Sequence, residues 1–229
     1  MKKIAIIPAR YGSKRIPNKN IKEFHGKPII AYAIQCAQSS GIYDEIMVST
    51  DNEIIAKIAT EYGASVPFYR SDKNSDDHAT TFDVINEVVS WYKKKKIEFE
   101  YASCIYACSP FITTGLLKQS FDILHNKNCD CVFPITKYSH PIQRAFRLSD
   151  SKKISPIYDI NSLRTQDLES TFHDAGMFYS FHVEKIMINK TLHPNNSIGI
   201  EIDELKSQDI DTESDWVLAE IKYNLHSFE

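Results

Sequence analysis

Residues 3–8 of this 229-residue chain read Lys-Ile-Ala-Ile-Ile-Pro, and residues 9–20 continue as Ala-Arg-Tyr-Gly-Ser-Lys-Arg-Ile-Pro-Asn-Lys-Asn. The first stretch predicts a short buried strand, and the second places four cations, a hydroxyl and two amides directly after it. Arginine and lysine form charge-assisted hydrogen bonds with phosphate, and the carboxyl ends of strands in α/β sheets form the crevice where ligands bind. The loop is therefore a candidate nucleotide site, and the alternative is a solvated basic turn.

The candidate loop contains a single glycine, Gly12. It therefore matches neither a Walker A loop, which needs two glycines before Lys-Ser/Thr, nor a GxGxxG fingerprint. A phosphate cradle in this loop must rely on side chains.

Composition limits the class of protein. The length fits one medium domain with a substantial core, and a net charge of −3 with 25% charged residues favours a small partner over nucleic acid or a membrane surface. The first apolar run is too short for a signal-peptide core, and no stretch approaches the about 18 apolar residues of a membrane span, so we expect a cytoplasmic protein. The five cysteines lack CxxC pairs, which favours reduced thiols.

Strand-like and helical patterns alternate along the chain, which is the rhythm of a parallel sheet covered by helices. The expected strands are residues 3–8, 45–49, 64–68, 101–107, 130–136 and 176–181. The expected helices are residues 29–38, 53–62, 81–93, 113–126 and 213–225. Thr50 with Glu53, and Thr212 with Asp215, have the spacing of helix N-terminal caps. The fold class is accordingly α/β, with a Rossmann-like, mostly parallel sheet flanked by helices.

Regularity is lost from Lys137 to about Thr171, where prolines and polar residues dominate. We expect an arm or insertion there. We interpret residues 1–229 as a single domain that carries this arm.

Near the C-terminus, Asp209 and Asp211 flank Ile210. In an extended segment, residues two apart point to the same face, so both carboxylates can converge on one point. Mg²⁺ is typically held by one or two carboxylates, with phosphate and water oxygens completing its shell. The alternative is that Asp211 belongs to a helix cap and Asp209 faces solvent.

These motifs resemble a known family, the cytidylyltransferases that activate nine-carbon acidic sugars (the CMP-sialic acid, or CMP-N-acylneuraminate, synthetases). The likeness is carried by the loop 9–20 and by residues 208–216, which resemble the family's Asp-x-Asp-Thr segment. Residues 48–51 and 66–70 resemble its second βα turn and the strand and loop that follow. The resemblance implies a fold of the nucleotide-diphospho-sugar transferase type, Mg²⁺ as cofactor on Asp209 and Asp211, and a homodimer formed through the arm.

The resemblance also implies which residues contact CTP. They are Arg10, Ser13, Lys14, Asn20, Arg70 and Thr81, with Arg15 and Lys19 as supporting cations. The residues implied for catalysis are Arg10, Lys14, Asp209 and Asp211. Tyr106 stands where related sialic acid enzymes often carry Gln.

Residues in the middle of the chain indicate which acidic sugar is the substrate. Residues 138–146, 164–168 and 172–179 resemble the pseudaminic acid branch of the family, and residues 173–176, His-Asp-Ala-Gly, depart from the Arg-x-Asn-Gly type segment of sialic and legionaminic acid enzymes. Side chains suited to a carboxylate and two N-acyl groups are Gln143, Arg144, Arg164, Gln166 and His173. His173 with Asp174 is alternatively a structural hydrogen-bonded pair, and Arg164 alternatively braces a dimer arm.

The expected reaction is attack of the sugar's anomeric hydroxyl on the α-phosphate of CTP, which releases pyrophosphate. Cys104 and Cys108 have no nearby His signature, so we expect no covalent intermediate. One alternative is the same chemistry on legionaminic, sialic or Kdo substrates. Another is a nucleotide-binding module without catalysis.

Overall fold

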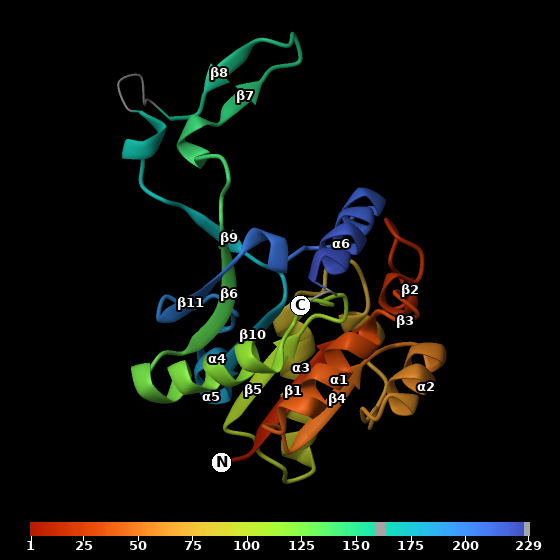
Figure 1. Cartoon of the computed structure of the whole chain (residues 1–229). Helices are drawn as coiled ribbons and strands as arrows, with labels where there is room; N and C mark the ends of the chain where they lie inside the picture. Colours follow the sequence, from red (N-terminus) through yellow and green to blue (C-terminus); the bar gives the residue numbers. More distant parts are fainter. Residues whose placement is uncertain (159–163, 227–229) are drawn as a thin grey trace.

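The computed structural model describes residues 1–158 and 164–226, which build a seven-stranded sheet in the order β11-β6-β10-β5-β1-β4, with β9 also paired to β6 (Figure 1). The strands are β1 (Lys3–Pro8), β4 (Glu45–Ser49), β5 (Tyr101–Ile105), β6 (Cys131–Lys137), β9 (Phe172–Asp174), β10 (Phe178–His182) and β11 (Ser197–Ile202). Strands β1, β4, β5, β6 and β11 share one direction, and β9 and β10 run against it. The predicted α/β class with a mostly parallel sheet is confirmed.

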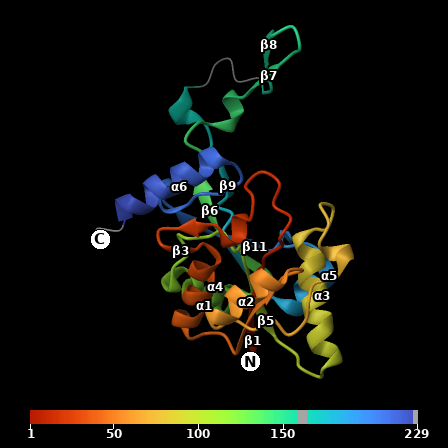
Figure 2. The same ribbon diagram turned by 90° about the vertical axis from the view of Figure 1, so that its right-hand side faces the viewer.

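The helices cover both faces of the sheet because β1 is apolar on both. Ile4 and Ile6 are fully buried against α3 and α5, whereas Ala5 and Ile7 are buried against α1. Figure 2 shows α3 and α5 on the opposite side of the sheet from α1 and α4. The helices are α1 (Ile30–Ser40), α2 (Glu53–Glu61), α3 (Thr81–Lys94), α4 (Thr114–Lys127), α5 (Val183–Asn189) and α6 (Glu213–His226). Among the described residues, no helix is long and apolar enough to cross a membrane.

Two sequence-based expectations are wrong. The expected strand 64–68 forms no ladder, because Ser65 makes a single bridge to Met47 and Pro67 has no N–H to continue the pairing. The expected cap of Thr50 with Glu53 is replaced by Asn52, whose side chain accepts hydrogen bonds from the N–H groups of the first turn of α2. The sequence reading also missed α5, β9 and β11.

The second expected cap is confirmed. Asp215 Oδ2 accepts a hydrogen bond from the Thr212 N–H at 2.8 Å, and Thr212 Oγ1 accepts one from the Asp215 N–H at 3.3 Å. This reciprocal pair fixes the start of α6 immediately after Asp209 and Asp211.

After β6 the chain leaves the sheet and returns at β9, and residues 138–158 and 164–171 project from the body as an arm (Figure 1). Its described part carries a hairpin of β7 (Phe146–Leu148) and β8 (Ile154–Pro156). The side chains of Phe146, Leu148 and Ile154 are 59, 68 and 66% exposed. The arm thus holds large apolar side chains away from the core of its own chain.

Candidate active site

A cavity of about 480 Å³ opens at the carboxyl ends of β1 and β5, beside the start of α3. It collects all of the nucleotide residues expected from the sequence, although they come from distant segments. The lining residues include Arg10, Ser13, Lys14, Arg15, Lys19, Asn20, Arg70, Thr81, Tyr106 and Asp211. All six expected CTP contacts are therefore in one place, together with one of the two expected metal ligands.

The basic loop 9–20 is held against the body at both of its ends. The Ala9 N–H donates to the Ser49 carbonyl at 2.9 Å, which continues the pairing of β1 with β4. Asn20 Nδ2 donates to the Arg10 carbonyl at 2.8 Å, and Ile16 is fully buried with Phe24. These contacts leave the cationic side chains to line the cavity.

Arg70 is a buried cation at the end of β4. Its Nε donates to Ser49 Oγ at 3.0 Å, its Nη2 donates to the Ser49 carbonyl, and its own N–H donates to the Thr50 carbonyl at 2.8 Å. Burial lowers the pKa of Arg70 to about 10, so the guanidinium remains charged at neutral pH. A fixed positive charge therefore stands on one wall of the cavity.

Arg10 and Lys14 are paired with a carboxylate that sequence analysis did not single out. Arg10 Nη1 donates to Asp77 Oδ1 at 2.8 Å, and Lys14 Nζ bonds Asp77 Oδ2. The hydrogen bonds from Lys14 and then Arg10 lower the pKa of Asp77 to about 2. No local pattern in the sequence joins Asp77 to a loop more than sixty residues earlier.

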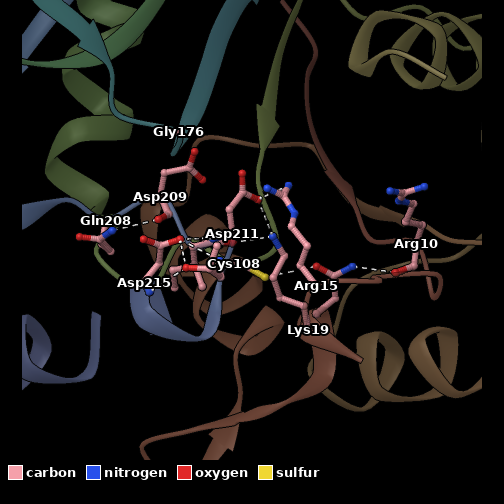
Figure 3. A network of polar contacts seen from close by, with 12 residues as sticks. Arg10, Arg15, Lys19, Cys108, Gly176, Gln208, Asp209, Asp211 and Asp215 are labelled. Carbon is pink, nitrogen blue, oxygen red and sulfur yellow. Dashed lines mark hydrogen bonds and ion pairs between the residues drawn. The ribbon is translucent and has the colours of Figure 1, made fainter. Parts of the chain in front are cut away.

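The expected metal residues stand at the other side of the basic loop (Figure 3). Asp211 Oδ1 lies 3.0 Å from Arg15 Nη2 and 3.3 Å from Lys19 Nζ, and Lys19 Nζ also donates to the Ile210 carbonyl at 2.6 Å. The intervening Ile210 is 1% exposed in a cluster with Phe24. Burial of Ile210 directs its two acidic neighbours away from that cluster.

Asp209 is more exposed to solvent than Asp211, although one side of it meets the backbone of a neighbouring turn. Gly176, at φ +65°, approaches it so closely that an added Cβ would lie 3.1 Å from Asp209 Cγ. Within residues 1–158 and 164–226, no hydrogen bond or ion pair to the Asp209 carboxylate is found. Partial burial, followed by the negative charge of Asp211, raises the pKa of Asp209.

This aspartate pair fits a hard divalent cation. It offers oxygen donors, and a nearby positive ion would relieve the cost that burial and Asp211 impose on the ionised Asp209. No group of three or more His, Cys, Asp or Glu side chains that could hold a metal is found in the described parts of the chain. Phosphate and water oxygens would therefore complete the shell of an ion bound here.

Cys108 lies beside the aspartates but is not poised as a nucleophile. Its Sγ donates to Asn20 Oδ1 at 3.3 Å, and burial raises the pKa of the thiol to about 12. The thiolate, the reactive form, is therefore scarce at neutral pH.

Tyr106 connects the cavity to the segment expected to select the sugar. Its hydroxyl is 3.5 Å from Thr81 Oγ1, and its ring packs edge-on against Tyr179. Tyr179 donates its hydroxyl hydrogen to Asp174 Oδ2, which also lies 3.1 Å from His193 Nε2. No motif in the sequence pointed to Tyr179 or His193 individually.

The expected sugar residues fall into two places. His173 lies on β9, where its Nδ1 contacts the Asp174 carbonyl at 2.8 Å. The other four stand on the arm and do not line the cavity: Gln143, Arg144, Arg164 and Gln166. One copy of the chain does not bring these four residues to its own nucleotide cavity.

Comparison with known proteins assigns the class. The family model for cytidylyltransferases matches residues 4–192, and this chain belongs to that family. The chain is 37% identical over 99% of its length to the pseudaminic acid cytidylyltransferase of Campylobacter jejuni subsp. jejuni serotype O:23/36 (strain 81-176), and the match covers 98% of that protein. It is 29% identical over 96% of its length to the CMP-N,N'-diacetyllegionaminic acid synthase of Legionella pneumophila, with 95% of that protein covered.

Solved structures agree on the fold. A CMP:2-keto-3-deoxy-manno-octonic acid synthetase complexed with CTP matches with a TM-score of 0.71 at 17% identity, over 100% of both chains. The 4-diphosphocytidyl-2C-methyl-D-erythritol synthase of Anaerococcus prevotii matches with a TM-score of 0.62 at 15% identity, over 97% of this chain and 98% of the other. The expected nucleotidyltransferase-type fold is confirmed.

Proposed function

We propose that this protein transfers CMP from CTP to pseudaminic acid, with release of pyrophosphate. The observation that carries the proposal is the near full-length identity of 37% to pseudaminic acid cytidylyltransferases. The cavity supports it, because it is lined by five cationic side chains and is large enough for a nucleotide.

In the proposed complex, Arg10 and Lys14 bind the β- and γ-phosphates of CTP, and Ser13 adds a neutral donor. Arg70 contributes a fixed positive charge to the same cavity. Asn20 positions this set, because its amide holds the Arg10 carbonyl. Such pre-arranged donors stabilise the charge that builds up on departing pyrophosphate without having to reorganise during the reaction.

The chemical step is a displacement at the α-phosphorus. The anomeric hydroxyl oxygen forms a bond to phosphorus, the bond to the pyrophosphate oxygen breaks, and the hydroxyl loses its proton. Alignment of the two reactants and neutralisation of phosphate charge supply most of the acceleration in reactions of this kind. We assign both tasks to residues of the cavity and to the aspartate pair.

Asp209 and Asp211 would hold Mg²⁺ in this scheme. When bound, the ion supplies positive charge beside the phosphates and acidifies the incoming hydroxyl. Lys19 and Arg15 keep Asp211 in place through their ion pairs, and Gly176 leaves the room that Asp209 needs.

Recognition of the acid sugar is proposed to involve a second copy of the chain. Arg144, Arg164, Gln143 and Gln166 stand on the arm away from the cavity, and the arm also exposes Phe146, Leu148 and Ile154. A homodimer would bury those apolar side chains and could carry the polar ones to the partner's cavity. We also propose that the enzyme works in the cytoplasm, where CTP is available.

The test is pyrophosphate release from CTP and Mg²⁺ with pseudaminic, legionaminic, sialic and Kdo acids in parallel. Selective release with pseudaminic acid is expected. Release with another acid alone would overturn the substrate assignment and keep the reaction, whereas CTP binding without release on any acid would favour a non-catalytic module.

A further inference from the structure

Four of the five cations lining the cavity are divided between two carboxylates. Arg15 and Lys19 pair with Asp211, whereas Arg10 and Lys14 pair with Asp77. Figure 3 shows Arg10 standing apart from Asp209 and Asp211. The proposed function uses the first carboxylate and gives no task to the second.

Asp77 uses both of its carboxylate oxygens on these cations. Oδ1 accepts from Arg10 Nη1 at 2.8 Å, and Oδ2 accepts from Lys14 Nζ. A phosphate oxygen is an acceptor of the same kind and sign, and it prefers the same partners. Asp77 therefore occupies the two groups that the proposed function assigns to the phosphates of CTP.

The loop before α3 brings both Asp76 and Asp77 to the cavity, but only the Asp77 carboxylate pairs with its cations. The Asp76 side chain folds back on its own loop, where it accepts hydrogen bonds at 2.8 Å from the N–H groups of both His78 and Ala79. The Asp76 carbonyl accepts a further bond from Arg10 Nη1 at 3.2 Å. The turn that Asp76 closes thus leaves the next residue facing Arg10 and Lys14.

We propose that Asp77 is an internal competitor for the nucleotide: its carboxylate holds Arg10 and Lys14 in the empty enzyme, yields them to the phosphates of CTP, and takes them back when pyrophosphate leaves. This inference rests on the proposed function, because it takes Arg10 and Lys14 as phosphate ligands. Asp77 is then a positioning residue that sets how tightly substrate and leaving group are held.

The strength of the Asp77 ion pairs sets how much the affinity for CTP and pyrophosphate should change when Asp77 is replaced, and in which direction. Asp77 is 44% exposed and Lys14 79% exposed, so each ion pair is weak. Removing the carboxylate is expected to tighten binding of both CTP and pyrophosphate by about threefold to tenfold. Loss of a merely structural contact would weaken binding instead.

Salt gives a second readout. In the wild-type protein the phosphates replace an internal anion, whereas without Asp77 they replace small anions drawn from solution. Added salt should therefore weaken CTP binding more steeply in an Asp77→Asn variant than in the wild type.

The experiment is calorimetric titration of CTP and, separately, of pyrophosphate into the wild-type protein, Asp77→Asn, Asp77→Glu and Asp72→Asn, at low and high salt. Asp72 is exposed in the same loop, and no ion pair to Arg10 or Lys14 is found for it in the described structure. Tighter binding and a steeper salt dependence are expected for Asp77→Asn alone, while Asp77→Glu keeps the charge and should resemble the wild type.

Unchanged or weaker binding of both ligands to a folded Asp77→Asn protein would overturn the inference and leave the proposed function intact. Failure of the wild-type protein to bind either ligand would overturn the proposed function, and this inference with it. Asp77→Ala serves as a second variant should Asp77→Asn fail to fold.

Discussion

The cavity beside β1 and the arm beyond β6 differ in how their side chains are partnered. In the cavity, Arg10 is held by Asp77, and Lys19 is held by Asp211. In the arm, Phe146 and Leu148 are more than half exposed. The cavity is organised within one chain, whereas the arm carries apolar surface that its own chain does not cover. We propose that one copy builds the nucleotide half of the site and that the sugar half needs a second.

The largest effect should come from a change of Asp209. This change tests whether groups needed for catalysis lie in the half of the site that we assign to one copy of the chain. Asp209→Asn keeps the size of the side chain and removes its charge, so it should lower kcat by about 10²- to 10³-fold through loss of electrostatic stabilisation. Turnover with CTP at rising Mg²⁺ measures this. Asp122→Asn on the outer side of α4 is the matched control, and near-normal turnover in Asp209→Asn would refute the assigned role.

The arm comes next. The double change of Phe146 and Leu148 to Ser removes two large apolar side chains from the exposed hairpin, so it should weaken a dimer by about a hundredfold. The melting temperature of the monomer should not fall, because these residues pack little on their own chain. Sedimentation over a concentration series measures dimer strength.

Arg147→Ser is the control for the arm. Arg147 lies between the two apolar residues, and its side chain points to the other face of β7. If the wild-type protein sediments as a monomer at micromolar concentration, the two-copy account fails.

A smaller effect is expected where Gly176 approaches Asp209. Gly176→Ala adds backbone strain of about 1–2 kcal/mol at φ +65° and pushes a methyl group against Asp209, so kcat should fall by about tenfold. Gly41→Ala is a close control, because Gly41 has φ +66° but no neighbour within 4 Å of the added Cβ. Both variants should lose stability, but only Gly176→Ala should lose turnover. Equal turnover in the two variants would refute the contact between the added methyl group and Asp209.

The smallest effect should come from Cys108. Cys108→Ser keeps a donor for Asn20 Oδ1 and should change kcat by less than about twofold, because the hydrogen bond it replaces is worth little. Alkylation of Cys108 should be slow at neutral pH and speed up as pH rises toward its pKa of about 12. A large loss of turnover in Cys108→Ser would revive a thiol mechanism.

The sequence predicted the features that depend on neighbouring residues. The strand 3–8, the basic loop after it and the Thr212–Asp215 cap are set by residues close together in the chain, and the structure has each of them. Family resemblance then joined this loop to Asp211. The irregular composition of residues 137–171 likewise indicated a segment outside the regular sheet.

What the sequence missed depends on contacts made only after folding. The position of Asp77 against Arg10 requires the loop before α3 to lie across the end of β1, and no local spacing encodes that. At the start of α2, Asn52 caps the helix in place of Thr50, because the Asn52 side chain accepts hydrogen bonds from two N–H groups of the first turn. The residues of β10 have the apolar pattern of an ordinary strand, which carries no information on direction. The antiparallel pairing of β10 with β5 and β6 was therefore not predictable from its own residues.

One measurement tests most directly whether the arm of one copy completes the site in the cavity of the other. A Lys14→Ala chain and an Arg164→Ala chain, each inactive as a homodimer, are unfolded, mixed and refolded together, and pyrophosphate release is measured. If the arm serves the partner's cavity, every mixed dimer has one intact site, and random pairing should restore about a quarter of wild-type activity. No recovery, with mixed dimers demonstrated by a tag on one chain, would contradict the account.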